Sequence, residues 1–271
     1  MGQRRNRLGW LMRQVRQLVY PRRCPYCQRV LGSVPVCQEC AAELETIRRK
    51  PGMRLDPEEH YFGDLSGAAA PYRYEGIVRD AVLHAKFQGA PWTADELGVE
   101  MARLLFGSEI RMRGAEPVPQ PVAGLRIGYD CVVPVPASSR KRGYNVPERM
   151  ARAVAQAVDV PLVPNALYRV SKKRHQVGLS LQERLINVAG AFRVTDPELV
   201  EGKQVLLVDD IITTGATVTA CTQALLAAGA QSVFAVALAA AENDAGTDNA
   251  RKNKNIRPED KKEFEKNRKK C

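Results

Sequence analysis

The chain has 271 residues, of which 45% are hydrophobic and 26% are charged, so it can bury one full α/β core beside a small accessory module. No stretch reaches the roughly 20 consecutive apolar residues of a membrane span, so the sequence predicts no transmembrane helix. The basic start, residues 1–7, leads into an apolar stretch that Arg13 and Arg16 interrupt. This pattern argues against a secretory signal and for a cytoplasmic location.

The formal net charge of +11 is concentrated at the two ends of the chain. Residues 1–50 hold 11 Lys and Arg against 3 Asp and Glu, residues 51–241 hold 20 against 20, and residues 242–271 hold 10 against 7. A basic front predicts contact with a polyanion, of which nucleic acid is the obvious one. A solvated basic face that only aids solubility explains the same charge.

The first segment, residues 1–20, is predicted to form an amphipathic helix over residues 8–19. Its apolar residues recur at helical spacing. They are Leu8, Leu11, Met12, Val15, Leu18 and Val19. Packing on its own protein is the commoner use of such a stripe, and peripheral contact with a membrane surface is the alternative.

Four cysteines in residues 21–50 form two Cys-x2-Cys pairs separated by nine residues: Cys24, Cys27, Cys37 and Cys40. Two thiolate pairs on facing turns suit a tetrahedral structural zinc ion, because four sulfur ligands leave no open position for catalysis. Disulfides and a redox Cys-x-x-Cys pair are the rival interpretations. Residues 51–64, which begin with Pro51-Gly52, are predicted to link this module to the main domain.

The main domain is expected over residues 65–241, with helices and strands in alternation. We predict a strand over residues 68–74, helices over 76–87 and 94–105, a surface loop over 107–128, a buried strand over 131–136, a helix over 146–158 and a mobile polar stretch over 167–192. This last stretch is rich in cations and contains His175, which we interpret as a surface residue of a closing lid.

The tail, residues 242–271, is charged and nearly without apolar residues, and we expect it to be disordered.

The most informative segment is the strand, turn and helix that begin at Val205. Val205 to Val208 is an apolar run typical of a buried parallel strand, and Asp209 and Asp210 follow at its expected end. The turn residues can aim backbone N–H groups and hydroxyls at a phosphate, with a helix over 217–228 adding its positive end. They are Thr213, Thr214, Gly215, Ala216 and Thr217. A plain strand-turn-helix explains the threonines but not the two acids, which we assign to sugar hydroxyls because an ionised Asp is only an acceptor.

A second anion site is predicted after the strand over residues 131–136. Ser139 adds a hydroxyl, and Arg140, Lys141 and Arg142 add three consecutive cations suited to a pyrophosphate group. Solvated surface charge is the rival interpretation. Two strand-end anion sites in one sheet are what a bisphosphorylated sugar requires.

These motifs resemble type I phosphoribosyltransferases, which bind phosphoribosyl pyrophosphate (PRPP), and the chain from residue 22 to 240 resembles the ComF family. The resemblance is carried by the cysteine pairs, Tyr72-Arg-Tyr-Glu-Gly76, Lys86-Phe87, Val133-Pro-Val-Pro136 with Arg142-Gly-Tyr-Asn145, residues 176–187 and the Asp-Asp turn. It implies an α/β fold with an open, mostly parallel sheet of the type I phosphoribosyltransferase kind, preceded by a four-Cys zinc module. At Asn145-Val-Pro-Glu148 the chain departs from many relatives, which puts the start of the following helix in doubt.

The resemblance also implies roles. Asp209 and Asp210 would hold ribose hydroxyls, the turn 213–217 the 5′-phosphate, the loop around Arg140 to Arg142 the pyrophosphate, and Mg²⁺ would bridge pyrophosphate and ribose. The family is associated with uptake of transforming single-stranded DNA. Two functions follow: a phosphoribosyltransferase whose acceptor the sequence does not name, or a non-catalytic module that senses PRPP or a nucleotide and binds single-stranded DNA.

Overall fold

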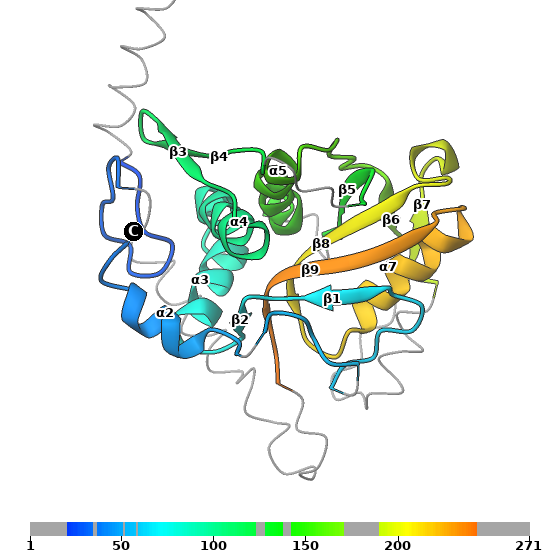
Figure 1. The fold of residues 1–271 in the computed structure, drawn as a ribbon, viewed down its shortest axis with the longest axis horizontal. Helices are drawn as coiled ribbons and strands as arrows, with labels where there is room; N and C mark the ends of the chain where they lie inside the picture. The colour runs from blue at the N-terminus through cyan, green and yellow to red at the C-terminus, as the bar shows by residue number, and fades with distance from the viewer. Residues whose placement is uncertain are drawn as a thin grey trace, which may run out of the picture.

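The computed structural model describes residues 21–34, 37–50, 52–57, 59–122, 128–137, 142–170 and 190–242 (Figure 1). The predicted helix over 8–19, Ser139 to Lys141 of the second anion loop, most of the predicted lid and nearly all of the tail lie outside these residues.

A parallel sheet forms the centre of the protein. Its strands are β1 (Gly67–Ala69), β2 (Tyr72–Arg73), β5 (Cys131–Pro134), β8 (Gln204–Ile212) and β9 (Ser232–Ala240). The order is β1-β9-β8-β5, β2 also pairs with β9, and every pair is parallel. The strands β5, β8 and β9 are buried almost throughout because helices cover both faces. The predicted open parallel sheet is confirmed.

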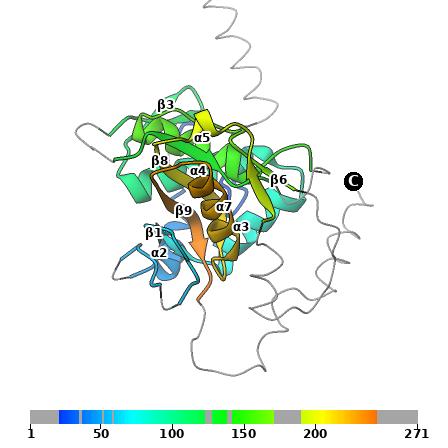
Figure 2. The same cartoon turned by 90° about the vertical axis from the view of Figure 1, so that its right-hand side faces the viewer.

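Two hydrophobic cores lie on the two faces of this sheet. The helices α3 (Gly76–Phe87), α4 (Pro91–Phe106) and α5 (Val146–Val158) share one core with Leu206 and Val208 of β8. The helix α7 (Ala216–Ala227) packs in the other core with Val205 and Leu207. Figure 1 shows the strands between α7 and the other three helices, and in Figure 2 α7 lies toward the viewer.

Three segments differ from the sequence predictions. The strand expected over 68–74 is divided into β1 and β2, since Pro71 between them has no N–H to donate. The expected loop over 107–128 contains a hairpin of β3 (Ile110–Arg113) and β4 (Glu116–Pro119), whose prolines sit in a two-stranded ladder where few N–H groups are needed. The ends of the expected mobile stretch pair as β6 (Leu167–Arg169) and β7 (Phe192–Val194), followed by the 3-10 turn η2 (Pro197–Leu199).

The cysteine module packs directly on the sheet domain. Its helix α2 (Ala41–Ile47) and three of its cysteines belong to the same core as Leu97 and Met101 of α4. Arg22 donates twice to Glu96, with both N–O distances at 2.7 Å, and the two side chains are 6% and 11% exposed. A bidentate pair shielded to this degree fixes the orientation of the module on α4.

The segment predicted as a linker is also packed in its described part. Leu55 and Phe62 are buried in the core beneath α7, and Arg54 forms a β-bridge with Ala69. The apolar side chains in this charged stretch explain why it lies against the sheet instead of spanning between two bodies.

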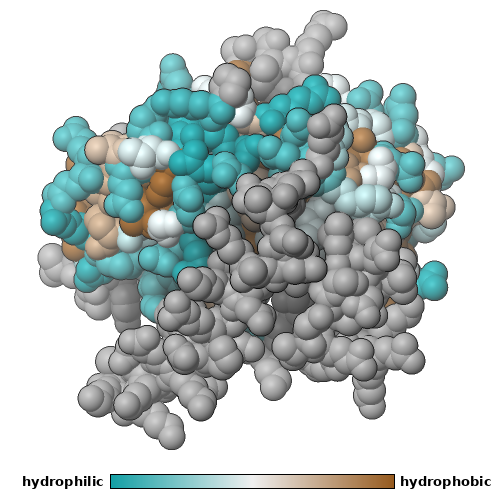
Figure 3. Space-filling model, turned by 90° about the horizontal axis from the view of Figure 1, so that it is seen from below, coloured by the Kyte–Doolittle hydropathy of each residue, from teal (hydrophilic) through white to brown (hydrophobic). Residues whose placement is uncertain are grey.

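Among the described helices, none is long and apolar enough to cross a membrane. Seen from below, the described surface is mostly hydrophilic, with hydrophobic residues in small separate patches (Figure 3).

Candidate functional site

Asp209 and Asp210 lie within β8, not after it. The strand continues to Ile212, and Asp209 is still paired with Ala237 of β9. The predicted strand end is therefore wrong by several residues, because the pairing with β9 continues past the acids. Successive side chains on a strand point to opposite faces, so the two carboxylates leave β8 on opposite faces of the sheet.

Asp210 faces α3, where it meets Lys86. The Lys86 ammonium lies 2.8 Å from Oδ2 of Asp210, whose side chain is 5% exposed. The other oxygen, Oδ1, accepts the backbone N–H of Ile211 at 2.8 Å. Burial alone would lower the pKa of Lys86, but the facing Asp210 carboxylate raises it above the usual value. Sequence reasoning gave Lys86 no role, although Lys86-Phe87 is one of the motifs that carry the resemblance.

Asp209 points to the opposite side, toward α7. Its charge contributes, after burial, to the raised pKa of the buried Cys221 thiol on α7. Burial first, and then the charge of Asp210, raise the pKa of Asp209 to about 8, while Lys86 opposes the shift. Among the described residues, Lys86 is the cation that opposes these two acids, so Asp209 ionises fully only above neutral pH or beside an added cation.

Asp209→Asn is expected to stabilise the ligand-free protein, and to do so more strongly as pH rises. The folded pKa of about 8 exceeds the ordinary value of 3.8, so the folded state binds the proton more tightly and the free energy of unfolding falls as pH increases between these values. Asparagine does not ionise. The gain from the substitution should therefore grow by about 2 kcal/mol or more between pH 5 and pH 8, measured by urea unfolding without added divalent ions.

The control for this comparison is Asp64→Asn, at an exposed position. Its effect on the free energy of unfolding should be small at both pH values. A gain for Asp209→Asn that stays constant with pH would contradict the raised pKa.

The predicted phosphate turn is formed at the end of β8. Gly215 has φ +83° and caps α7, which begins at Ala216, one residue before the predicted start. Thr213 is exposed and Thr214 is half-buried. Backbone N–H groups at the start of a twelve-residue helix therefore lie behind a small polar turn, the arrangement that binds phosphate.

Sequence reasoning missed the segment that holds this turn in place. Tyr61 N–H donates to the Thr214 carbonyl at 3.0 Å, and the Thr219 hydroxyl donates to the Tyr61 carbonyl at 2.8 Å. A Cβ on Gly215 would lie 2.2 Å from that same Tyr61 oxygen. Residues 59–63, expected to be part of a linker, form the back wall of the turn.

The described end of the second anion loop meets the first site at Lys86. Arg142 Nε donates to the Lys86 carbonyl, and its guanidinium lies 5.7 Å from the centroid of the Phe87 ring. Tyr144 donates its hydroxyl to the Ala85 carbonyl. The structure therefore brings Arg142 and Asp210, 68 positions apart in the chain, to one residue of α3; it does not describe Ser139, Arg140 and Lys141.

The four cysteines of the module converge on one point. All four Sγ atoms lie within 4.8 Å of one another, with Cys24–Cys40 and Cys27–Cys37 both at 3.8 Å. Tetrahedral sulfur ligands about 2.3 Å from a zinc ion are about 3.8 Å apart, whereas a disulfide requires about 2.05 Å. Burial raises the pKa of Cys24 to about 11, so a bound cation is needed to keep such a thiol ionised. The donor set fits a structural metal ion.

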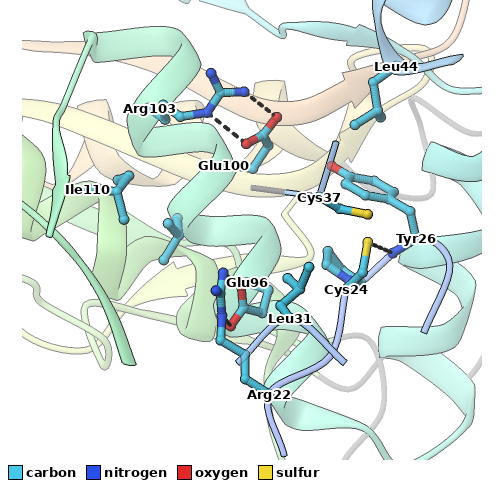
Figure 4. A pocket seen from close by; sticks show the side chains of 12 residues that line it. Arg22, Cys24, Tyr26, Leu31, Cys37, Leu44, Glu96, Glu100, Arg103 and Ile110 are labelled. Atoms are coloured by element: carbon cyan, nitrogen blue, oxygen red, sulfur yellow. Dashed lines mark hydrogen bonds and ion pairs between the residues drawn. The ribbon is translucent and has the colours of Figure 1, made fainter. Parts of the chain in front are cut away.

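A small cavity of about 30 Å³ separates the module from α4 (Figure 4). Beside the cavity, the Glu100 carboxylate accepts hydrogen bonds from the Tyr72 hydroxyl and from the Arg103 guanidinium. The buried Tyr26 hydroxyl has no hydrogen-bond partner among the described residues, and the cavity has room for a water molecule to supply one. The cavity is lined by residues of the module and of α4 and by Ile110 of β3, without Asp209 or Asp210.

Comparison with known proteins identifies the class of this fold. The family described as phosphoribosyl transferase domain matches residues 141–267, which include the Asp-Asp turn and extend past residue 240, where the motif resemblance ended. Two solved structures are similar in part. The allosteric regulatory enzyme of purine biosynthesis is 24% identical with a TM-score of 0.32, and the glutamine PRPP amidotransferase of B. subtilis is 22% identical with a TM-score of 0.31. In both cases the match covers 53% of this chain and 25% of the other.

The protein is thus a type I phosphoribosyltransferase-like protein with a four-cysteine module in front. Competence protein F of Haemophilus influenzae is 28% identical over 231 residues, covering 80% of this chain and 90% of that protein. DNA utilization protein YhgH of Salmonella typhi is 32% identical over 141 residues, covering 51% and 58%, and YhgH of Escherichia coli K12 is 30% identical over the same length. The chain is therefore similar to competence protein F over most of its length and to the YhgH proteins over about half of it.

Proposed function

We propose that the protein binds PRPP at the carboxyl edge of its sheet, acts as a phosphoribosyltransferase and serves DNA uptake. The observation that carries the proposal is the convergence at β8. Asp210 and Arg142 meet at Lys86, and the Gly215 turn follows on the same strand. The carboxylates can accept hydrogen bonds from sugar hydroxyls, and they lie between two regions suited to anions. This arrangement matches a pentose that carries a phosphate at one end and a diphosphate at the other.

Each part of the ligand has a counterpart in the site. The turn of Thr213, Thr214, Gly215, Ala216 and Thr217 receives the 5′-phosphate through N–H groups and hydroxyls. Asp209 and Asp210 accept hydrogen bonds from the ribose hydroxyls. The loop from Ser139 through Arg140 and Lys141 to Arg142 receives the diphosphate.

The reaction is a substitution at the anomeric carbon. The bond from that carbon to the diphosphate oxygen breaks, a bond to the acceptor forms with inversion, and the acceptor loses its proton. The cations of the second loop stabilise the departing diphosphate, and the fixed carboxylates hold the ribose for attack. Carboxylate oxygens suit Mg²⁺, which when bound would neutralise diphosphate charge.

Zinc is the metal we propose for the four-cysteine centre, because sulfur pairs at 3.8 Å match its tetrahedral shell. A reducing compartment keeps such thiols free, which is consistent with the cytoplasm. The names of the relatives, competence protein F and DNA utilization protein, support the link to DNA uptake. They also favour the second candidate, a non-catalytic PRPP-responsive module that binds single-stranded DNA through a basic surface.

Asp209→Asn is expected to weaken PRPP binding by about 10-fold or more, since it replaces a charged hydrogen-bond acceptor. Isothermal titration with PRPP and Mg²⁺ measures this effect. Wild-type protein that takes up no PRPP would refute the proposed site. Asp64→Asn, exposed and outside the proposed contacts, should bind like wild type.

The two candidate functions differ in turnover. With pools of purine, pyrimidine and amine acceptors, an enzyme releases pyrophosphate, and Asp209→Asn abolishes the release. A binding module releases none, yet binds oligonucleotides with an affinity that falls steeply with salt and survives Asp209→Asn.

A further inference from the structure

Lys86 occupies an unusual position for a residue in the last turn of a helix. Lysine at such a position ordinarily keeps its ammonium in water while its stem covers apolar surface. Here Nζ lies 2.8 Å from Asp210 Oδ2 at the sheet, and the side chain is 21% exposed. The cation is held at the proposed sugar site.

The backbone of Lys86 is fixed as well. Its carbonyl accepts from Arg142, and the neighbouring Ala85 carbonyl accepts from Tyr144 at 2.5 Å. The last turn of α3 is therefore tied to the second anion loop by its main chain and to β8 by its side chain. Lys86 therefore contacts both Asp210, which we propose holds the sugar, and Arg142 of the loop that we propose holds the diphosphate.

The ammonium has more donors than Asp210 uses. Lysine carries three N–H groups, and within the described part of the chain Asp210 is the acceptor that Nζ reaches. Two donors are left for a ligand. An anionic group that adjoins the ribose hydroxyls held by Asp210 comes within range of them, and in PRPP that group is the diphosphate.

We propose that Lys86 is a specificity-determining residue that contacts the diphosphate and selects a pentose 1-diphosphate over the same sugar phosphate without it. This inference rests on the proposed function and adds to it the means of discrimination. Ribose 5-phosphate would still fill the turn and reach the carboxylates, but it would gain nothing from the ammonium.

The test compares PRPP with ribose 5-phosphate by isothermal titration. Lys86→Met should weaken PRPP binding about 10-fold or more and ribose 5-phosphate binding less than about 3-fold. Lys86→Arg should retain most of the discrimination. Lys203→Met removes a lysine at the opposite end of β8, where Nζ donates to the Leu199 carbonyl, and should leave both affinities unchanged.

A second comparison separates contact with the ligand from support of Asp210. Lys86→Met leaves a carboxylate buried without its partner, so the substitution is also made in an Asp210→Asn background, which removes both charges and protects folding. If Lys86 contacts the diphosphate, the 10-fold loss for PRPP persists in that background.

Equal losses for both ligands, or a loss that vanishes with Asp210→Asn, would overturn the inference while leaving the PRPP site standing. Wild-type protein that binds neither ligand would overturn both. Thermal unfolding of each variant confirms that folded protein is compared.

Discussion

Removal of the metal from the four-cysteine centre is expected to destabilise the whole sheet domain, not the module alone. Cys24, Cys37 and Cys40 are part of the core that also contains Leu97 and Met101 of α4. Without a cation, thiolates that are only 3.8 Å apart repel or take up protons. We expect a loss on the order of several kcal/mol, seen as a lower midpoint of thermal unfolding with increasing chelator, together with release of one zinc ion per chain.

Matched cysteine variants distinguish the centre from ordinary packing. Cys40→Ser should lose the metal and unfold at a temperature close to that of the chelated protein. Cys131→Ala removes an equally buried thiol of β5 from outside the centre and should keep the metal, with a loss of about 1 kcal/mol. A midpoint that does not respond to the chelator, with the metal shown to be gone, would contradict the shared core.

The elements with strong periodicity were predicted best. The helices over residues 76–87 and 146–158 have the predicted bounds, because apolar residues at helical spacing face a core along their whole length. The Cys-x2-Cys spacing predicted a cluster, and the four sulfur atoms do converge. These patterns are local, so the sequence carries them directly.

The parts that were missed depend on contacts between distant segments. Acids are uncommon in strands, so we predicted that the strand ends at Asp209. In the structure, β8 continues to Ile212 because its pairing with β9 continues that far. Lys86 and Asp210 are far apart in the chain, and the residues around a lysine at a helix end do not indicate that it has a buried partner. The back wall at Tyr61 likewise exists only once residues 59–63 have folded onto the turn. For the same reason, local patterns predicted the anion-binding turn but not the residue that joins the two anion sites.

Gly215→Ala is expected to abolish PRPP binding and to lower stability, because the turn has no room for a side chain. Gly215 has φ +83°, which favours glycine, and an added Cβ would lie 2.2 Å from the Tyr61 carbonyl oxygen. That oxygen belongs to a backbone held by the Thr219 hydroxyl and by Thr214, so relief requires the turn to move away from its wall. We expect a loss of about 2–4 kcal/mol in urea unfolding and at least about 100-fold in PRPP affinity by titration.

Gly202→Ala separates the two causes of this effect. Gly202 also has positive φ, +67°, but an added Cβ there meets nothing within 4 Å, and the residue precedes β8 at the end remote from the turn. It should cost only the backbone strain, about 1 kcal/mol, and leave PRPP affinity unchanged. If Gly215→Ala behaved like Gly202→Ala in both measurements, the Tyr61 backbone would not restrict the space at residue 215, and the phosphate would have to bind elsewhere. If stability fell while affinity held, the turn would be a structural element of the fold and not the seat of the 5′-phosphate.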